Sequence, residues 1–189
     1  MKTKLIKHIF AVFIMMMGFA MTGLSQPTVT ATANVVGQVV LTKTADLNFG
    51  SILSNLTGGT VIVAIDNSST PSGTATRVPG VLTTHGIFNI AKGANTSVIL
   101  TYATAASLTG PALSAPMLMS DYSSRCNISS TDGTTGGETV IMGSPYTITD
   151  AGNITASSIY VHLGATVTAG ASQMAGSYTN TITLTATYN

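Results

Sequence analysis

Threonine alternates with apolar residues along the last part of the chain. From Tyr178 to Tyr188 every odd-numbered position is threonine, and most even-numbered positions are apolar. Successive side chains of a strand point to opposite faces, so this period of two predicts a strand with one buried and one solvated face. We expect Ile182, Leu184 and Tyr188 to face the core. The residues expected to face solvent are Thr181, Thr183, Thr185 and Thr187.

The same period of two begins soon after residue 25. Val29, Ala31, Ala33 and Val35 alternate with polar residues, and Val39 and Leu41 follow beyond Gly37. A glycine within a strand often marks a bulge or a bend. The pattern therefore predicts a long first strand that changes direction at this glycine.

Short apolar runs lie between these two segments, separated by connectors rich in Gly, Ser, Thr and Asn. After residue 25 no window has the i, i+3, i+4, i+7 spacing of an amphipathic helix. Many short strands at such spacing are typical of an antiparallel sandwich or barrel, and no linker divides residues 26–189. We expect one all-β domain with further strands at Asp46–Ile52, Thr60–Ile65, Gly86–Ala91, Ser97–Ala103, Met117–Tyr122, Thr139–Met142, Ile159–Leu163 and Ala165–Thr168.

Residues 1–25 have the three parts of a secretory signal peptide. A basic segment ending at His8 precedes an apolar run from Ile9 to Met21, and Gly23 and Ser25 are small residues before Gln26. As a helix the apolar run is about 20 Å long, shorter than the roughly 30 Å hydrocarbon core of a bilayer. We therefore predict a cleaved signal-peptide helix instead of a membrane anchor. The product is expected in the periplasm, on the cell surface or outside the cell, with no membrane span.

Charge is sparse and excludes one class of partner. Only 7% of the 189 residues are charged, where about 25% is usual. Without residues 1–25 the chain keeps four basic and six acidic residues. A nucleic-acid binder needs a clustered basic face, which four scattered residues do not supply. We expect no nucleic-acid partner.

The side chains that could carry chemistry are few. After residue 25 the only histidines are His85 and His162. His162 lies in a strand pattern, and we expect it to share a face with Tyr160 at the surface or partly buried. No cluster has metal-ligand spacing and no nucleophile-elbow sequence occurs, so we predict no metal, no cofactor and no catalytic residue. Cys126 has no partner for an intrachain disulfide and is expected to be a small buried hydrophobe.

Several short segments resemble known families. A glycine at Gly176, the alternation that follows it and the penultimate Tyr188 resemble the C-terminal signature of chaperone–usher pilins. The chain is also similar to domain of unknown function family 4402 and to spore coat protein U domains. The segments that carry this similarity are Leu47–Ile52, Gly86–Ile90, Leu163–Val167 and Ala175–Tyr178.

The resemblance implies an immunoglobulin-like β-sandwich and a structural or adhesive surface subunit. In pilins an exposed groove is filled first by a periplasmic chaperone and then by a strand from a neighbouring copy, which is β-strand addition. The implied partners are a second copy of the chain, forming a fibre, or such a chaperone. The residues of the C-terminal edge strand in this comparison are Gly176, Tyr178, Ile182, Leu184, Ala186 and Tyr188.

Two questions stay open at this level. The segment with Val29, Ala31, Ala33 and Val35 is either the donor strand or the first core strand. The chain is either an assembling subunit or a monomeric secreted module that binds glycan or protein through the loops Asp66–Pro79 and Ser129–Gly137. A small secreted enzyme is the remaining alternative, and the scarcity of titratable groups argues against it.

Overall fold

The computed structural model describes residues 29–33, 35–53 and 55–189, which fall into two units, residues 1–35 and 36–189. The predicted signal peptide lies outside the described residues. Within the described part of the first unit, Val29 and Val35 are 92% and 93% exposed, and Val29, Ala31, Ala33 and Val35 form no strand. The prediction of a first core strand beginning at Val29 is therefore wrong. An alternating pattern forms a strand only where a second backbone pairs with it, and here pairing begins at Val40.

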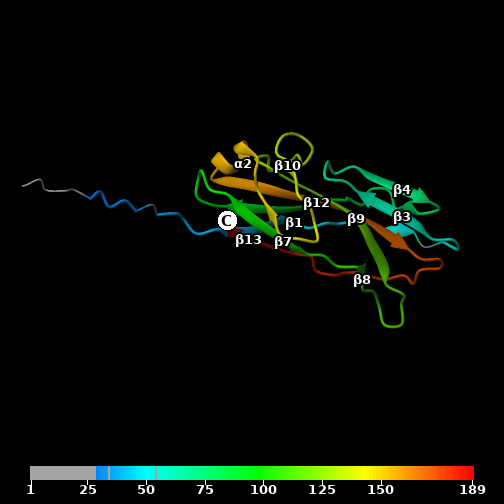
Figure 1. Ribbon diagram of the computed structural model, residues 1–189. Coiled ribbons are helices and arrows are strands. Elements are labelled where there is room, and N and C mark those ends of the chain that lie inside the picture. The colour runs from blue at the N-terminus through cyan, green and yellow to red at the C-terminus, as the bar shows by residue number, and fades with distance from the viewer. Residues whose placement is uncertain (1–28, 34, 54) are drawn as a thin grey trace, which may run out of the picture. The chain divides into compact units, whose positions relative to one another are not determined.

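The second unit is organised around one long strand, β12 (Ser158–Ala169). Its first half pairs with β6 (Gly86–Ala91) and its second half with β3 (Gly59–Val63). Along its other edge it pairs with β9 (Met117–Asn127). Residues 161–167 are all buried, as expected for a strand covered on both faces. Figure 1 shows β12 with β3 and β4 toward one end and α2 and β10 toward the other.

Shorter strands extend this large sheet. β1 (Val40–Ala45) pairs with β6 and β4 (Ser69–Gly73) pairs with β3, giving the order β1-β6-β12-β3-β4. β8 (Ser107–Leu108) and β10 (Glu138–Thr139) pair with β9. All of these pairs are antiparallel, as the sequence predicts.

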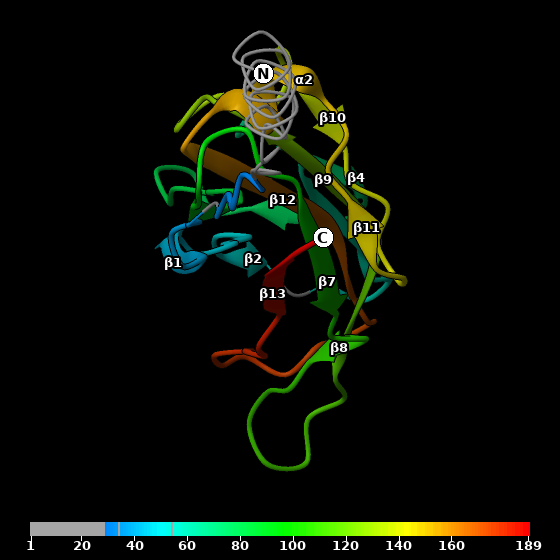
Figure 2. The same ribbon diagram turned by 60° about the vertical axis from the view of Figure 1, so that its left-hand side comes forward.

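A smaller sheet forms the second layer. It has the order β11 (Tyr146–Thr147), β7 (Val98–Ala103), β13 (Thr183–Tyr188), with β13 at its edge. Figure 2 shows β13 beside β7, with β1 and β2 on the other side of β13. Outside both sheets lie the pair β2 (Ile52–Leu53) and β5 (Thr76–Arg77) and the five-residue helix α2 (Ala151–Thr155). Among the described residues no helix is long and apolar enough to cross a membrane.

The core lies between the two layers. One cluster joins Leu100 and Leu184 of the small sheet to Ile90, Val161 and Leu163 of the large one. A second cluster is formed mainly by β3, β9 and the end of β12, and Tyr122 and Ile182 pack against both clusters. The prediction of an all-β, antiparallel sandwich is confirmed. Its immunoglobulin-like topology stays a prediction.

Several segments differ from the sequence prediction, and the predicted strand Thr139–Met142 contributes only Thr139 to β10. Asp46–Ile52 is not a continuous strand, because the Asn48 Oδ1 accepts the Gly50 N–H at 2.8 Å and Gly50 turns the chain with φ 73°. The connector after Asp150 contains α2, whose first turn is capped by the Asp150 carboxylate accepting the Asn153 N–H at 3.0 Å. A helix of one turn is too short to produce a detectable period.

Candidate functional site

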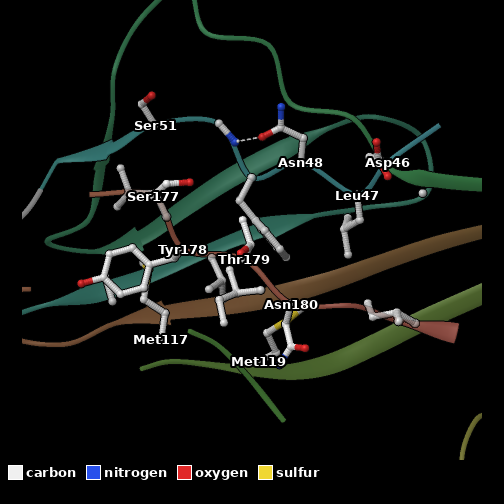
Figure 3. Close-up of a pocket in the computed structure, with 18 of the residues that line it drawn as sticks. Asp46, Leu47, Asn48, Ser51, Met117, Met119, Ser177, Tyr178, Thr179 and Asn180 are labelled. Atoms are coloured by element: carbon white, nitrogen blue, oxygen red, sulfur yellow. Dashed lines mark hydrogen bonds between the residues drawn. The ribbon is translucent and has the colours of Figure 1, made fainter. Parts of the chain in front are cut away.

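A groove of about 1020 Å³ separates the segment that follows β1 from the segment that precedes β13. Its floor comes from the large sheet, with Phe88 of β6, Met117 and Met119 of β9, and Leu163 and Val167 of β12. Figure 3 shows Asp46, Leu47, Asn48 and Ser51 at the top and Met117 and Met119 at the bottom, below Tyr178 and Asn180. The volume is at the upper end of the range for sites that enclose a small molecule, so a short peptide segment also fits it.

The first rim is the turn-containing segment from Asp46 to Leu53. Leu47 and Ile52 on this rim are half-buried, and the Asn48 side chain fixes the turn through its bond to Gly50. The sequence comparison identified Leu47–Ile52 as a family-like segment but did not predict that it would line a site. The turn lets apolar and polar residues of one short stretch face the same groove.

The second rim runs from Gln173 to Ile182. The Gln173 amide, 9% exposed, donates to the Ala115 carbonyl at 2.6 Å and to the Tyr178 hydroxyl at 2.9 Å. The Tyr178 hydroxyl in turn donates to the Met174 carbonyl at 2.8 Å. These side-chain hydrogen bonds hold the rim in place. Among the described residues of the rim, only Thr179 pairs through its backbone with another segment, in a bridge to Thr109.

Gly176 occupies a position on this rim that only glycine fits. Its φ is 153°, and a Cβ there would lie 2.3 Å from Cγ of Pro111. We expect Gly176→Ala to lower the free energy of unfolding by roughly 2 kcal/mol, from backbone strain plus the contact with the proline. Gly80 has φ 80° and no atom near its missing Cβ, so Gly80→Ala should cost only about 1 kcal/mol. Urea denaturation of both variants measures the difference, and equal losses would show that Pro111 moves aside.

The groove lining ends at Ile182, next to a strand with an unpaired edge. β13 pairs with β7 on one side, and the part of the chain that the structure describes gives it no strand on the other. At its end the Tyr188 hydroxyl accepts the Gly93 N–H at 2.8 Å and donates to the Gly37 carbonyl. The tyrosine therefore fastens the chain before β1 to the end of β13.

The structure divides the predicted edge-strand residues into two groups. Gly176, Tyr178 and Ile182 line the groove. Leu184 is buried and Ala186 and Tyr188 are half-buried against the core, while the threonines between them are exposed. The predicted alternation is confirmed. The segment with Val29 and Val35 belongs to the other unit, and its role as a donor stays a prediction.

The histidine prediction is wrong in its environment. His162 is fully buried, and its Nδ1 lies 2.8 Å from Nε2 of His85, which is 1% exposed. β12 is covered on both faces, so a side chain that points away from the groove is buried beneath the loops of the opposite side. Within the described residues no group of three or more His, Cys, Asp or Glu side chains could hold a metal ion.

Cys126 and the two loops also have defined environments. Cys126 is fully buried, as predicted, and burial raises the pKa of its thiol to about 12. Such a thiol is protonated and inert at neutral pH. Much of the predicted loop Asp66–Pro79 is instead the strands β4 and β5. The loop Ser129–Gly137 is held internally, because the Asp132 carboxylate accepts from Thr134 and Thr135 and these bonds keep the Asp132 pKa at about 2.

Comparison with family models identifies a family for this chain. The family model described as Domain of unknown function (DUF4402) matches residues 39–188, which include both rims, the floor and β13. No curated protein and no solved structure matches the chain significantly.

Proposed function

The chain belongs to the DUF4402 family of domains of unknown function, and we propose that it is an exported, non-catalytic structural or adhesive surface subunit assembled by β-strand addition. The observation that carries the proposal is the groove with an apolar floor, whose lining ends at Ile182 beside β13, a strand with one open edge. An unpaired edge beside apolar side chains favours pairing with another chain. A pilin-like, immunoglobulin-like sandwich would use such an edge in the same way.

The groove has the chemistry that an added strand requires. Six apolar side chains on its floor and rims are only half-buried, so each has surface left to cover. They are Leu47, Ile52, Phe88, Leu108, Tyr178 and Ile182. Main-chain hydrogen bonds to an edge give affinity in strand addition, and pockets for alternate side chains give specificity.

The segment before residue 36 of a second copy fits as the donor. Val29, Ala31, Ala33 and Val35 would all point to one face of an added strand. Seven strand residues span about 23 Å, against about 20 Å for the six residues of β13. Burying each valine contributes about 1.5–3 kcal/mol before the cost of ordering the segment. A periplasmic chaperone would cover the same groove before assembly.

The test compares the chain beginning at Gln26 with the chain beginning at Val36. The longer chain should form concentration-dependent multimers in sedimentation. The shorter chain should stay monomeric with an unchanged far-ultraviolet circular dichroism spectrum. A peptide of residues 26–37 should then stabilise the shorter chain, by about 2.7 kcal/mol at one hundred times its Kd.

A charge placed in the groove provides the control. Leu47→Asp should abolish peptide binding, because the peptide would have to bury an unpaired carboxylate. Thr44→Asp adds the same charge at an exposed position of β1 and should leave binding unchanged. A shorter chain that unfolds would show that residues 26–35 belong to the fold. Two monomeric chains that ignore the peptide would instead favour the secreted binding module.

A further inference from the structure

The histidine pair, His85 and His162, is buried on the side of β12 opposite the groove. Leu163 lines the groove, so the adjacent His162 points to the other face of the sheet. The two rings are tilted by 39° with centroids 5.0 Å apart, and His85 Nε2 lies 2.8 Å from His162 Nδ1. We call these two facing atoms the inner nitrogens and the other two the outer nitrogens.

Both outer nitrogens face oxygens that only accept hydrogen bonds. His85 Nδ1 lies 2.6 Å from the Asn67 Oδ1. His162 Nε2 lies 3.0 Å from the Ser129 carbonyl oxygen and 3.2 Å from the Asn127 Oδ1. A hydrogen on each outer nitrogen satisfies these contacts, and a bare nitrogen there would oppose lone pairs.

The orientation of both asparagine amides is fixed by other bonds. The Asn67 Oδ1 also accepts the backbone N–H of His85 at 3.0 Å. The Asn127 amide donates its hydrogens to the carbonyls of Asp132 and Thr135 at 2.7 and 3.0 Å. Its Oδ1 accepts the Ser129 N–H at 2.9 Å. Turning either amide over would place donors against donors.

The inner nitrogens then have room for one hydrogen. If both rings are neutral, their single hydrogens are on the outer nitrogens and two lone pairs meet at 2.8 Å. With both rings charged, two N–H groups meet head-on. One additional proton makes the contact a hydrogen bond. A metal ion does not fit between them, because two ligand nitrogens at zinc-bond lengths and a tetrahedral angle are about 3.3 Å apart.

We propose that His85 and His162 share one proton and that this shared proton links the turn at Asp66–Ser68 to the loop at 128–137. The turn reaches the pair through Asn67, and the loop reaches it through Ser129 and Asn127. The proton carries a single positive charge in the interior. A second proton would separate the rings and with them the turn and the loop.

The charged and titratable groups around the pair come from each neighbouring element. Asp66 on the turn and Asp132 on the loop favour the positive charge. Arg125 of β9 lies opposite His162 in register, but its guanidinium is directed to the carbonyls of Gly136 and Gly137. Tyr160 lies two residues along the same face of β12. β6 contributes no charged residue.

The direction of the pKa shifts opposes a second proton on the pair. Burial lowers the pKa of His162, while the Ser129 carbonyl and Asp132 oppose the shift. Burial and then the charge on His162 lower the pKa of His85 to about 4. The second proton is therefore excluded over the range in which two free histidines become charged.

Nitrogen-15 NMR of the chain beginning at Gln26 tests the proposal, since its only histidines are His85 and His162. At pH 5.5 we expect both outer nitrogens to be protonated and the inner nitrogens to share one hydrogen. A neutral pair, a doubly charged pair or a bare His162 Nε2 would overturn the proposal. Below pH 4, amide hydrogen exchange in loop 128–137 should rise more than exchange in β7, and an equal rise would overturn the link between turn and loop.

The variant Asn67→Ala distinguishes a proton shared by the two histidines from a contact between the rings that has only a structural role. Without the Asn67 oxygen, His85 can move its own hydrogen to Nε2 and donate to His162 with no extra proton. The pH at which the pair takes up its first proton should then fall by at least one unit, a tenfold loss of proton affinity. Asn95 has φ 58°, close to the 65° of Asn67, so Asn95→Ala carries a similar backbone cost and should leave the titration unchanged. Equal titrations in both variants would overturn the proposal.

Discussion

Leu184→Ala is expected to lower the free energy of unfolding by about 2–5 kcal/mol. Leu184, the second residue of β13, is 4% exposed and packs in the cluster that joins the two sheets. Removing its branched end leaves a cavity, and the rigid strands on either side limit how far the site can collapse. Chemical denaturation followed by circular dichroism measures the loss.

Thr183→Ala is the matched control for this change. Thr183 is the neighbouring residue of β13, and its side chain is exposed on the outer face. Its replacement should cost well under 1 kcal/mol. Similar losses at the two positions would mean that the register of β13 is shifted by one residue, since such a slip exchanges the two faces.

Acidification from pH 6.5 to pH 5 is expected to remove about 2 kcal/mol of stability through His85, and about 3 kcal/mol by pH 4. Its pKa is about 4 in the folded protein, because of burial and the charge on His162, and near 6.5 when unfolded. Below pH 6.5 the unfolded chain therefore binds more protons than the folded one. As the pH is lowered, the free energy of unfolding decreases until the pH is below the pKa of His85 in the folded protein.

Urea denaturation between pH 7.5 and 5 measures the loss of stability that comes from His85 separately from the loss caused by protonation of carboxylates. The pKa values of Asp66, Asp132 and Glu138 are below their ordinary values, so these groups take up protons mostly below this range. In His85→Gln the loss over the same range should shrink by half or more. A wild-type protein with constant stability from pH 7.5 to 5 would contradict the expected burial of His85.

The strands could be predicted where local pattern and burial agree. The threonine alternation of β13 and the apolar runs of β6 and β7 appear directly in the sequence. The pattern at Val29 is equally regular and forms no strand, because alternation does not reveal which backbone pairs with it. A local side-chain bond also overrode the strand pattern at Asn48.

The groove and the histidine pair depend on contacts that a linear pattern does not reveal. The rims of the groove are more than one hundred residues apart in the sequence, and 77 positions separate His85 from His162. A signal was nevertheless present. His162 lies between Val161 and Leu163 in a continuous apolar run, and a histidine in a strand buried on both faces needs a polar partner.

The central place of β12 also determines the order in which the sheet can be built during synthesis. β3, β6 and β9 all pair with this strand, yet about 40 residues lie between the end of β9 and the end of β12. At ribosomal speeds of about 5–20 residues per second, that interval lasts roughly 2–8 s. Until then the sheet exists as separate groups of paired strands with open edges, which are prone to aggregation. The topology thus gives a late strand control over folding, and nascent chains that end before Ser158 should be the ones that most need a holding chaperone.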